Sequence, residues 1–159
     1  MIRLFNKAAL GHESRPMGDP LNPPVFEIDP HTVQPAYQAM VRDAFEYARH
    51  VLGDRAVPDV VHWYRRTPAP NASIGLDPEL WPDLNTVGIC TADGEIWILA
   101  EHGPAAVAMT AAHEAMHRYR IGRMVPDGHR CGDKCTSDEE ALCNEFALDY
   151  LRGRGLIAA

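Results

Sequence analysis

The positions of proline and glycine divide this chain of 159 residues into segments that can and cannot form regular structure. Five prolines fall between Arg15 and Gln34, and their fixed φ angles and missing amide donors exclude a helix or a central strand there. We therefore expect residues 1–34 to form an extended, proline-rich N-terminal arm. Residues 35–159 are enough for one domain that buries its own core.

Three segments of this domain have the features of helices. Residues 35–52 begin with a proline, which the first helical turn tolerates, carry apolar side chains at three- and four-residue spacing, and are followed by a glycine. Residues 104–121 also begin with a proline and end before a glycine, around an alanine-rich run. A last helix is expected to start near Ser137 and to run toward Gly153.

Short strands are predicted between the first two helices. Residues 57–66 are rich in β-branched and aromatic side chains and are bounded by prolines, which is typical of a strand. Residues 87–91 and 95–99 flank an Ala-Asp-Gly turn at 92–94 and predict a hairpin. Helices and short strands in this order predict an α+β fold.

The second predicted helix carries the most specific chemical signal, the sequence TAAHEAMH. His113 and His117 are four residues apart, so on a helix their imidazoles share a face and can converge on one zinc ion. Glu114 points about 100° away from His113, close enough to take a proton from water activated by the metal. A chance match has a probability of about one in forty in this composition, so the interpretation depends on a third ligand.

The last predicted helix offers that ligand. One face of this helix is an apolar arc formed by Leu142, Cys143, Phe146, Ala147, Tyr150 and Leu151. Glu140 lies at the edge of this arc and is the preferred candidate, with Glu139 as the alternative and Asn144 placed to orient a ligand. Glu145 lies on the opposite side and is expected to face water. A competing interpretation is a capping box, in which Glu140 reaches back toward Ser137.

Two segments together resemble a known family. HEAMH at 113–117, followed by EALCNEFA at 140–147, resembles the gluzincin metallopeptidases, most closely the ImmA/IrrE type, and a Thr-x-Ala precedes the first histidine as in that family. Cys143 stands where the family has alanine. The resemblance implies a zincin-like domain whose small sheet, with an edge hairpin, packs on the HExxH helix and whose C-terminal helix carries the third ligand. It also implies a protein substrate, often a repressor.

On this interpretation the chain is a zinc metallopeptidase. His113, His117 and Glu140 would bind Zn2+, and Glu114 would act first as general base and then as general acid toward the leaving amine. Such a reaction also needs a donor that stabilises the oxyanion. His129 in the loop between the last two helices is our candidate.

Arg130 and Tyr119 are the other candidates for the oxyanion donor. Arg130 lies next to His129 in that loop and is an alternative donor, whereas Tyr119 lies on the far side of its helix from the two histidines and is expected in the core. The same loop contains Cys131 and Cys135, which we expect to be free thiols. A local disulfide, or a second metal site that includes Cys143, are the alternatives.

Composition limits the partners. The formal net charge is -7 and the longest basic run is Arg65-Arg66, which disfavours nucleic acid, and no segment approaches the length of a membrane helix. We therefore expect a cytoplasmic enzyme with a protein or peptide substrate. The oligomeric state is left open. The alternatives are a zincin-fold binding or regulatory module with little turnover, and a globular protein with a coincidental HExxH.

Overall fold

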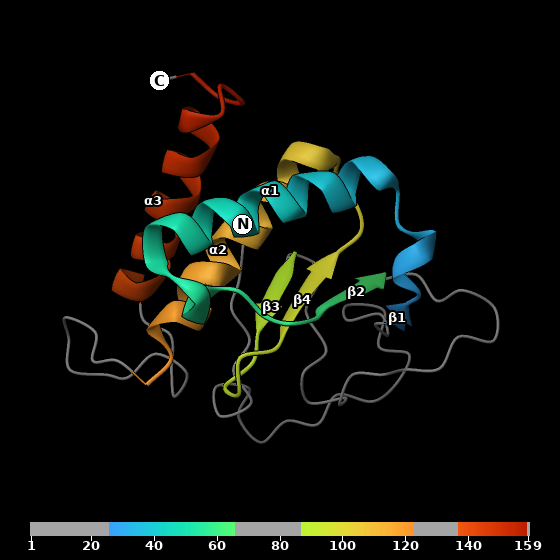
Figure 1. The fold of residues 1–159 in the computed structure, drawn as a ribbon, viewed down its shortest axis with the longest axis horizontal. Coiled ribbons are helices and arrows are strands. Elements are labelled where there is room, and N and C mark those ends of the chain that lie inside the picture. Colours follow the sequence, from blue (N-terminus) through green and yellow to red (C-terminus); the bar gives the residue numbers. More distant parts are fainter. Residues whose placement is uncertain (1–25, 66–86, 123–136, 159) are drawn as a thin grey trace.

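The structure is a computed structural model, and it describes residues 26–65, 87–122 and 137–158; every structural statement below concerns these residues. It confirms the predicted α+β class, with three helices and a four-stranded sheet (Figure 1). In chain order the elements are β1 (Phe26–Ile28), the 3-10 helix η1 (Pro30–Thr32), α1 (Pro35–Leu52), the 3-10 helix η2 (Asp54–Ala56), β2 (Val61–Arg65), β3 (Gly88–Cys90), β4 (Ile96–Leu99), α2 (Pro104–Arg120) and α3 (Ser137–Gly153).

The sheet is mixed and has the order β1-β2-β4-β3. β1 runs antiparallel to β2, β2 runs parallel to β4, and β4 runs antiparallel to β3. The predicted hairpin of β3 and β4 is therefore confirmed. Its turn is closed by a hydrogen bond from the Gly94 amide to the Thr91 carbonyl oxygen at 2.9 Å, and Gly94 has the positive φ of 91° that favours glycine.

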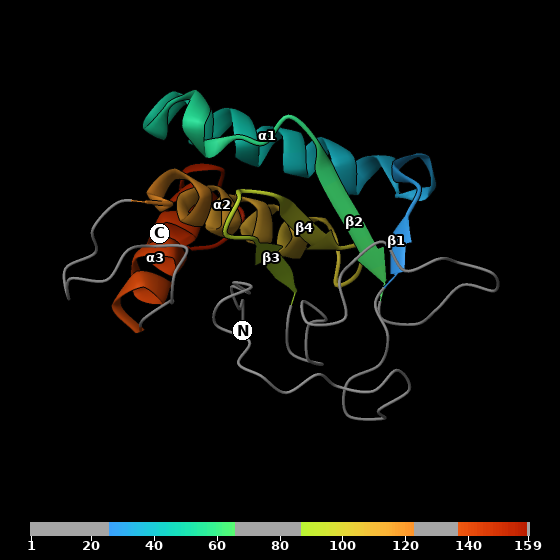
Figure 2. The same ribbon diagram turned by 90° about the horizontal axis from the view of Figure 1, so that it is seen from below.

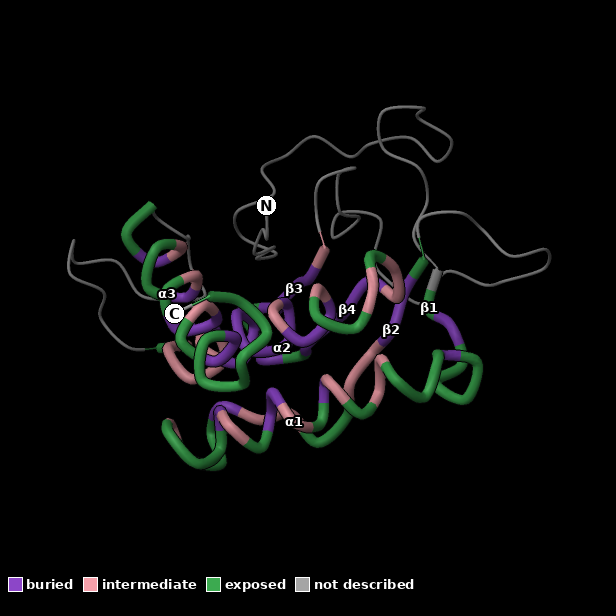
Figure 3. The backbone as a smooth tube through the Cα atoms, turned by 90° about the horizontal axis from the view of Figure 1, so that it is seen from above, coloured by how far each residue is buried: buried purple, intermediate pink, exposed green. Residues whose placement is uncertain are grey.

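Helix α2 lies at the centre of the fold. It packs on β3 and β4 of the sheet and also contacts α1 and α3 (Figures 1 and 2). Four of its alanines are completely buried, and their small side chains let the neighbouring elements approach the helix closely: Ala108, Ala111, Ala112 and Ala115. Figure 3 shows that α2 is buried along most of its length, whereas α1 exposes one side. Polar side chains on α2 are thereby held in the interior.

Helix α3 is tied to α1 by polar contacts as well as by packing. The Tyr150 hydroxyl donates a hydrogen bond to Asp43 Oδ2 at 2.9 Å, and Arg154 Nε donates to the same oxygen at 2.9 Å. The guanidinium of Arg154 also lies over the rings of Tyr47 and Tyr150. The hydrogen bond from Arg154 is the main reason why the pKa of Asp43 is lowered. These contacts fix the C-terminal end of α3 against α1.

Three details differ from the expectations. Residues 26–28, within the segment expected to be an arm, form the edge strand β1. Pro30 then begins a single 3-10 turn, a position at which the backbone N–H that proline lacks would have no partner within the helix. The strand predicted at 57–66 is shorter, because η2 and a bend precede Val61. Leu142, expected in the apolar arc of α3, is 37% exposed at its margin.

Within the described residues, no helix combines the length and the apolar character that crossing a membrane requires. The segments 1–25, 66–86 and 123–136 lie outside the description, and with them most of the predicted arm and the loop between α2 and α3.

Candidate metal centre

Two histidines on α2 form the base of the site. His113 and His117 are one helical turn apart, and both side chains are completely buried. Their Nε2 atoms lie 3.0 Å from each other. The predicted convergence of the two imidazoles is therefore present, and it follows from the helical geometry of TAAHEAMH.

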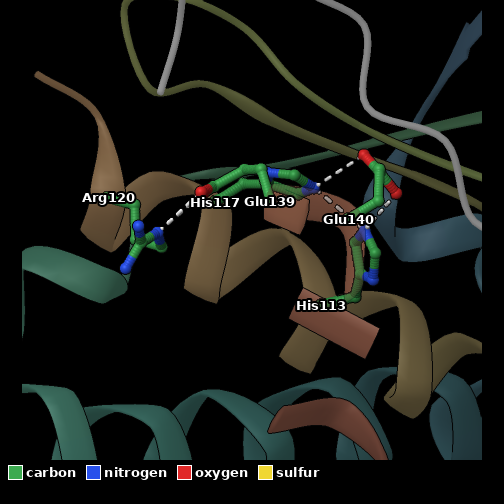
Figure 4. A network of polar contacts seen from close by, with 5 residues as sticks. All are labelled: His113, His117, Arg120, Glu139 and Glu140. Carbon is green, nitrogen blue, oxygen red and sulfur yellow. Dashed lines mark hydrogen bonds and ion pairs between the residues drawn. The ribbon is translucent and has the colours of Figure 1, made fainter. Parts of the chain in front are cut away.

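Glu140 of α3 meets this pair. Its Oε1 lies 3.2 Å from His117 Nε2 and its Oε2 lies 3.4 Å from His113 Nε2 (Figure 4). Two donors that are each about 2.1 Å from one zinc ion at the tetrahedral angle lie about 3.4 Å apart. The separations of 3.0 to 3.4 Å among these three side chains therefore suit donors that share one ion. The carboxylate is directed at the histidines, which is not the arrangement of the alternative capping box.

The electrostatics of the three groups follow from burial and mutual contact. Burial by itself raises the pKa of Glu140, but hydrogen bonds with His113 and His117 outweigh it and lower the pKa to about 2. Burial lowers the pKa of His113, and contact with Glu140 opposes this only in part. An ionised carboxylate beside an imidazole that resists protonation is the state in which these groups bind metal ions.

Glu139, the alternative ligand, has a different partner. Its side chain is fully buried as expected, but both carboxylate oxygens accept hydrogen bonds from Arg120 Nε, at 2.7 and 2.8 Å. Figure 4 shows the two glutamates directed to different side chains of α2, Glu139 toward Arg120 at its C-terminal end and Glu140 toward the two histidines. The structure thus separates two residues that the sequence could only rank.

Cys143 adds a sulfur to the site. It follows Glu140 by three residues on α3, it is completely buried, and its Sγ and one nitrogen each of His113 and His117 all lie within 4.8 Å of one another. Burial raises the pKa of its thiol to about 11. From the sequence, Cys143 is expected as a metal ligand only together with the loop cysteines. Its spacing from Glu140 on the same helix face was the signal that could have placed it here.

Glu114 lies between α2 and the edge of the sheet. Its side chain is completely buried and packs on β3 where that strand has Gly88. A Cβ at residue 88 would lie 2.8 Å from Glu114 Oε1 and would also collide with the Thr110 methyl group. Gly88 therefore permits the close approach of strand and helix. In the sequence, the only indication of this role is a glycine within a predicted strand.

The other predicted residues divide into two groups. Asn144 contacts His113 and opposes the lowering of its pKa by burial, Tyr119 packs on the core, and Glu145 is exposed and paired with Arg152. The loop residues proposed for the oxyanion site or for a second metal lie outside the described residues: His129, Arg130, Cys131 and Cys135.

These observations define the class of the protein. It is an α+β protein in which a buried group of two histidines and a cysteine could hold a metal ion, with a glutamate in contact with both histidines. Imidazole, thiol and carboxylate are the donors that zinc accepts, so the donor set fits that ion. Comparisons with protein-family models, with curated proteins and with solved structures gave no match.

Proposed function

We propose that the chain is a zinc-dependent metallopeptidase of the zincin type, which hydrolyses peptide bonds in a protein substrate. One observation carries the proposal: the Glu140 carboxylate lies 3.2 and 3.4 Å from the Nε2 atoms of His117 and His113, the two histidines of HExxH. The sequence resemblance of 113–117 and 140–147 to gluzincins supports the same donor set and the choice of a protein substrate.

Each residue of the site has a role in this proposal. His113, His117 and Glu140 would bind the ion, and zinc when bound supplies a Lewis acid that makes water nucleophilic near neutral pH. Glu114 would take the proton of the attacking water and pass it to the leaving amine. Asn144 would orient His113, which it contacts, since such partners fix the ring of a ligand. His129 remains our proposed oxyanion donor.

The first test is the metal content per chain, measured by elemental analysis on protein purified without added metal. We expect about one zinc per chain in the wild type, and its loss in the His113→Ala/His117→Ala double variant. A wild type that contains no zinc, even after incubation with zinc, would reject the proposal. Zinc that survives the double substitution would have to lie elsewhere, and the loop cysteines would then be tested.

The second test separates metal binding from turnover, with an unfolded protein and a peptide library as substrates. Glu114→Gln should retain zinc and lose hydrolysis, because the amide cannot accept the proton. Glu140→Ala should lose both. Zinc retained undiminished in Glu140→Ala would show that Glu140 is not a ligand.

A second candidate function is a zincin-fold binding or regulatory module that retains a metal without turnover. The observation that favours it is the presence of Cys143 beside the histidines, because sites with four protein ligands are usually structural. In that case Glu114→Gln would change neither zinc content nor any activity, since metal binding alone does not need a base.

A further inference from the structure

Glu140 and Cys143 present two donors to the same pair of histidines. They are three residues apart on α3, which places both side chains on the face that meets α2. Glu140 is partly exposed, whereas Cys143 is completely buried. The two donors to the histidine pair therefore differ in their access to solvent.

The Cys143 sulfur is close enough to act as a ligand after a small adjustment. It lies within 4.8 Å of a nitrogen of each histidine, whereas donors that share one zinc are about 3.5 Å apart when one of them is sulfur. The cysteine is not in a disulfide. Coordination would replace its S–H bond by a bond from sulfur to the metal and release the proton to solvent.

The number of protein donors determines whether a bound zinc ion keeps a position for water. Three protein ligands leave one position of a tetrahedral zinc site for water, and four leave none. His113, His117, Glu140 and Cys143 make four. A thiolate among them would also favour zinc over harder ions such as magnesium or manganese.

We propose that Cys143 is a fourth protein ligand, which closes the resting metal centre, and that its withdrawal opens the position that hydrolysis needs. This inference rests on the proposed function, because it concerns regulation of the same site. It predicts a metal bound more tightly than three ligands allow, and an enzyme whose basal turnover is restrained by its own thiol.

The test is the absorption spectrum of the full chain loaded with cobalt(II), which occupies zinc sites and gives a near-ultraviolet charge-transfer band when a thiolate is bound to it. We expect the band in the wild type and its loss in Cys143→Ala and Cys143→Ser, with one cobalt per chain retained. Affinity for cobalt should fall by at least about tenfold, and turnover should rise in the same variants. The serine variant keeps nearly the volume of the thiol, so it guards against a failure of Cys143→Ala to fold.

Three other cysteines supply matched controls. Cys90 is also buried, but it lies on β3 and its thiol donates to the Thr91 carbonyl oxygen at 3.6 Å. Cys90→Ala and the double variant Cys131→Ala/Cys135→Ala should both keep the band. A band that survives Cys143→Ala and disappears in the double variant would overturn the inference.

The remaining outcomes distinguish this inference from the proposed function. One outcome is that the wild type binds cobalt without a thiolate band and that His113→Ala/His117→Ala no longer binds it. This result would overturn the role of Cys143 and leave the three-ligand centre intact. Failure of the wild type to bind cobalt or zinc at all would overturn both.

Discussion

At the scale of single residues, the centre depends on two adjacent glutamates that face different partners. Successive residues of a helix are turned by about 100°, so Glu139 and Glu140 cannot point the same way. Glu139 is buried against Arg120 of α2, and Glu140 contacts His117 and His113, which precede Arg120 by about one and two turns of α2. The ion pair of Arg120 and Glu139 therefore fixes the first turn of α3 and, with it, the approach of Glu140.

Removing one partner of this pair should be costly. In Arg120→Met the Glu139 carboxylate stays buried without its guanidinium, and we expect a loss of about 3 kcal/mol or more in the free energy of unfolding. The double variant Arg120→Met/Glu139→Leu should regain much of this loss, because neither charge remains. Urea unfolding of the three proteins measures the effect. Equal losses in the single and double variants would mean that the pair is not the cause.

Gly88→Ala tests the contact between the edge strand and α2. The added methyl group would meet Thr110 and Glu114, and overpacking of this kind costs about 1–3 kcal/mol. We expect lower stability and, on the proposed function, a fall in hydrolysis larger than any fall in zinc content, because Glu114 would be displaced while the proposed ligands would not. Gly153→Ala is the matched control, since nothing lies within 4 Å of a Cβ there. Thermal unfolding measures the loss of stability in both variants, and elemental analysis measures their zinc content.

The site could be predicted from sequence only where its chemistry is local. His113 and His117 belong to one helix, so their spacing determines that they share a face. The roles of Gly88, Arg120 and Cys143 depend instead on how α2 meets β3 and α3, and no local pattern encodes that packing. For the same reason the sequence could rank Glu139 and Glu140 but could not identify the arginine that contacts Glu139.

At the scale of elements, α1 and α3 are held together by a polar cluster distant from the histidines in sequence. Asp43 accepts hydrogen bonds from Tyr150 and Arg154, and its pKa is lowered. A carboxyl whose pKa is lower in the folded than in the unfolded state stabilises the fold at any pH above its unfolded pKa. This contribution is lost as the pH falls through the pKa of the folded state.

This linkage gives a prediction for Asp43→Asn. Near neutral pH the variant should be less stable than the wild type by about 1 kcal/mol or less, because the pair with Arg154 is largely exposed. The difference should shrink as the pH falls below the ordinary value of 3.8, because the carboxyl of the unfolded chain then binds a proton that the folded state, with its lower pKa, still lacks. Urea unfolding from pH 7 to pH 3 measures it. A constant difference across this range would contradict the assignment.

The helices were predictable to within one or two residues, whereas of the sheet only the strand β2, with a longer span, and the β3–β4 hairpin were predicted. Proline and glycine stand at or beside the ends of α1 and α2 and dictate those ends locally. The strand β1 follows a proline-rich stretch and forms because β2 offers it a free edge, which is a property of the assembled sheet. The order β1-β2-β4-β3 likewise results from contacts between distant segments.

At the scale of the whole molecule, a metal bound between α2 and α3 should stabilise the fold. A ligand that binds only the folded state at one hundred times its Kd adds about 2.7 kcal/mol, which for a chain of this length raises Tm by roughly 5–10 °C. We expect a chelator to lower Tm by this amount and added zinc to restore it. The His113→Ala/His117→Ala variant should respond to neither, and a response equal to that of the wild type would place the metal elsewhere.

The parallel pairing of β2 with β4 has a consequence for the order of folding. Every residue pair in it, from Val61 with Ile96 to Tyr64 with Leu99, joins positions 35 apart in the chain. The entropy of closing such a loop is lost before the pairing stabilises anything, whereas the β3–β4 hairpin and the helices need only neighbouring residues. We therefore expect the hairpin and α2 to form early and the pairing of β2 with β4 to form late. The two histidines then belong to an element that folds early.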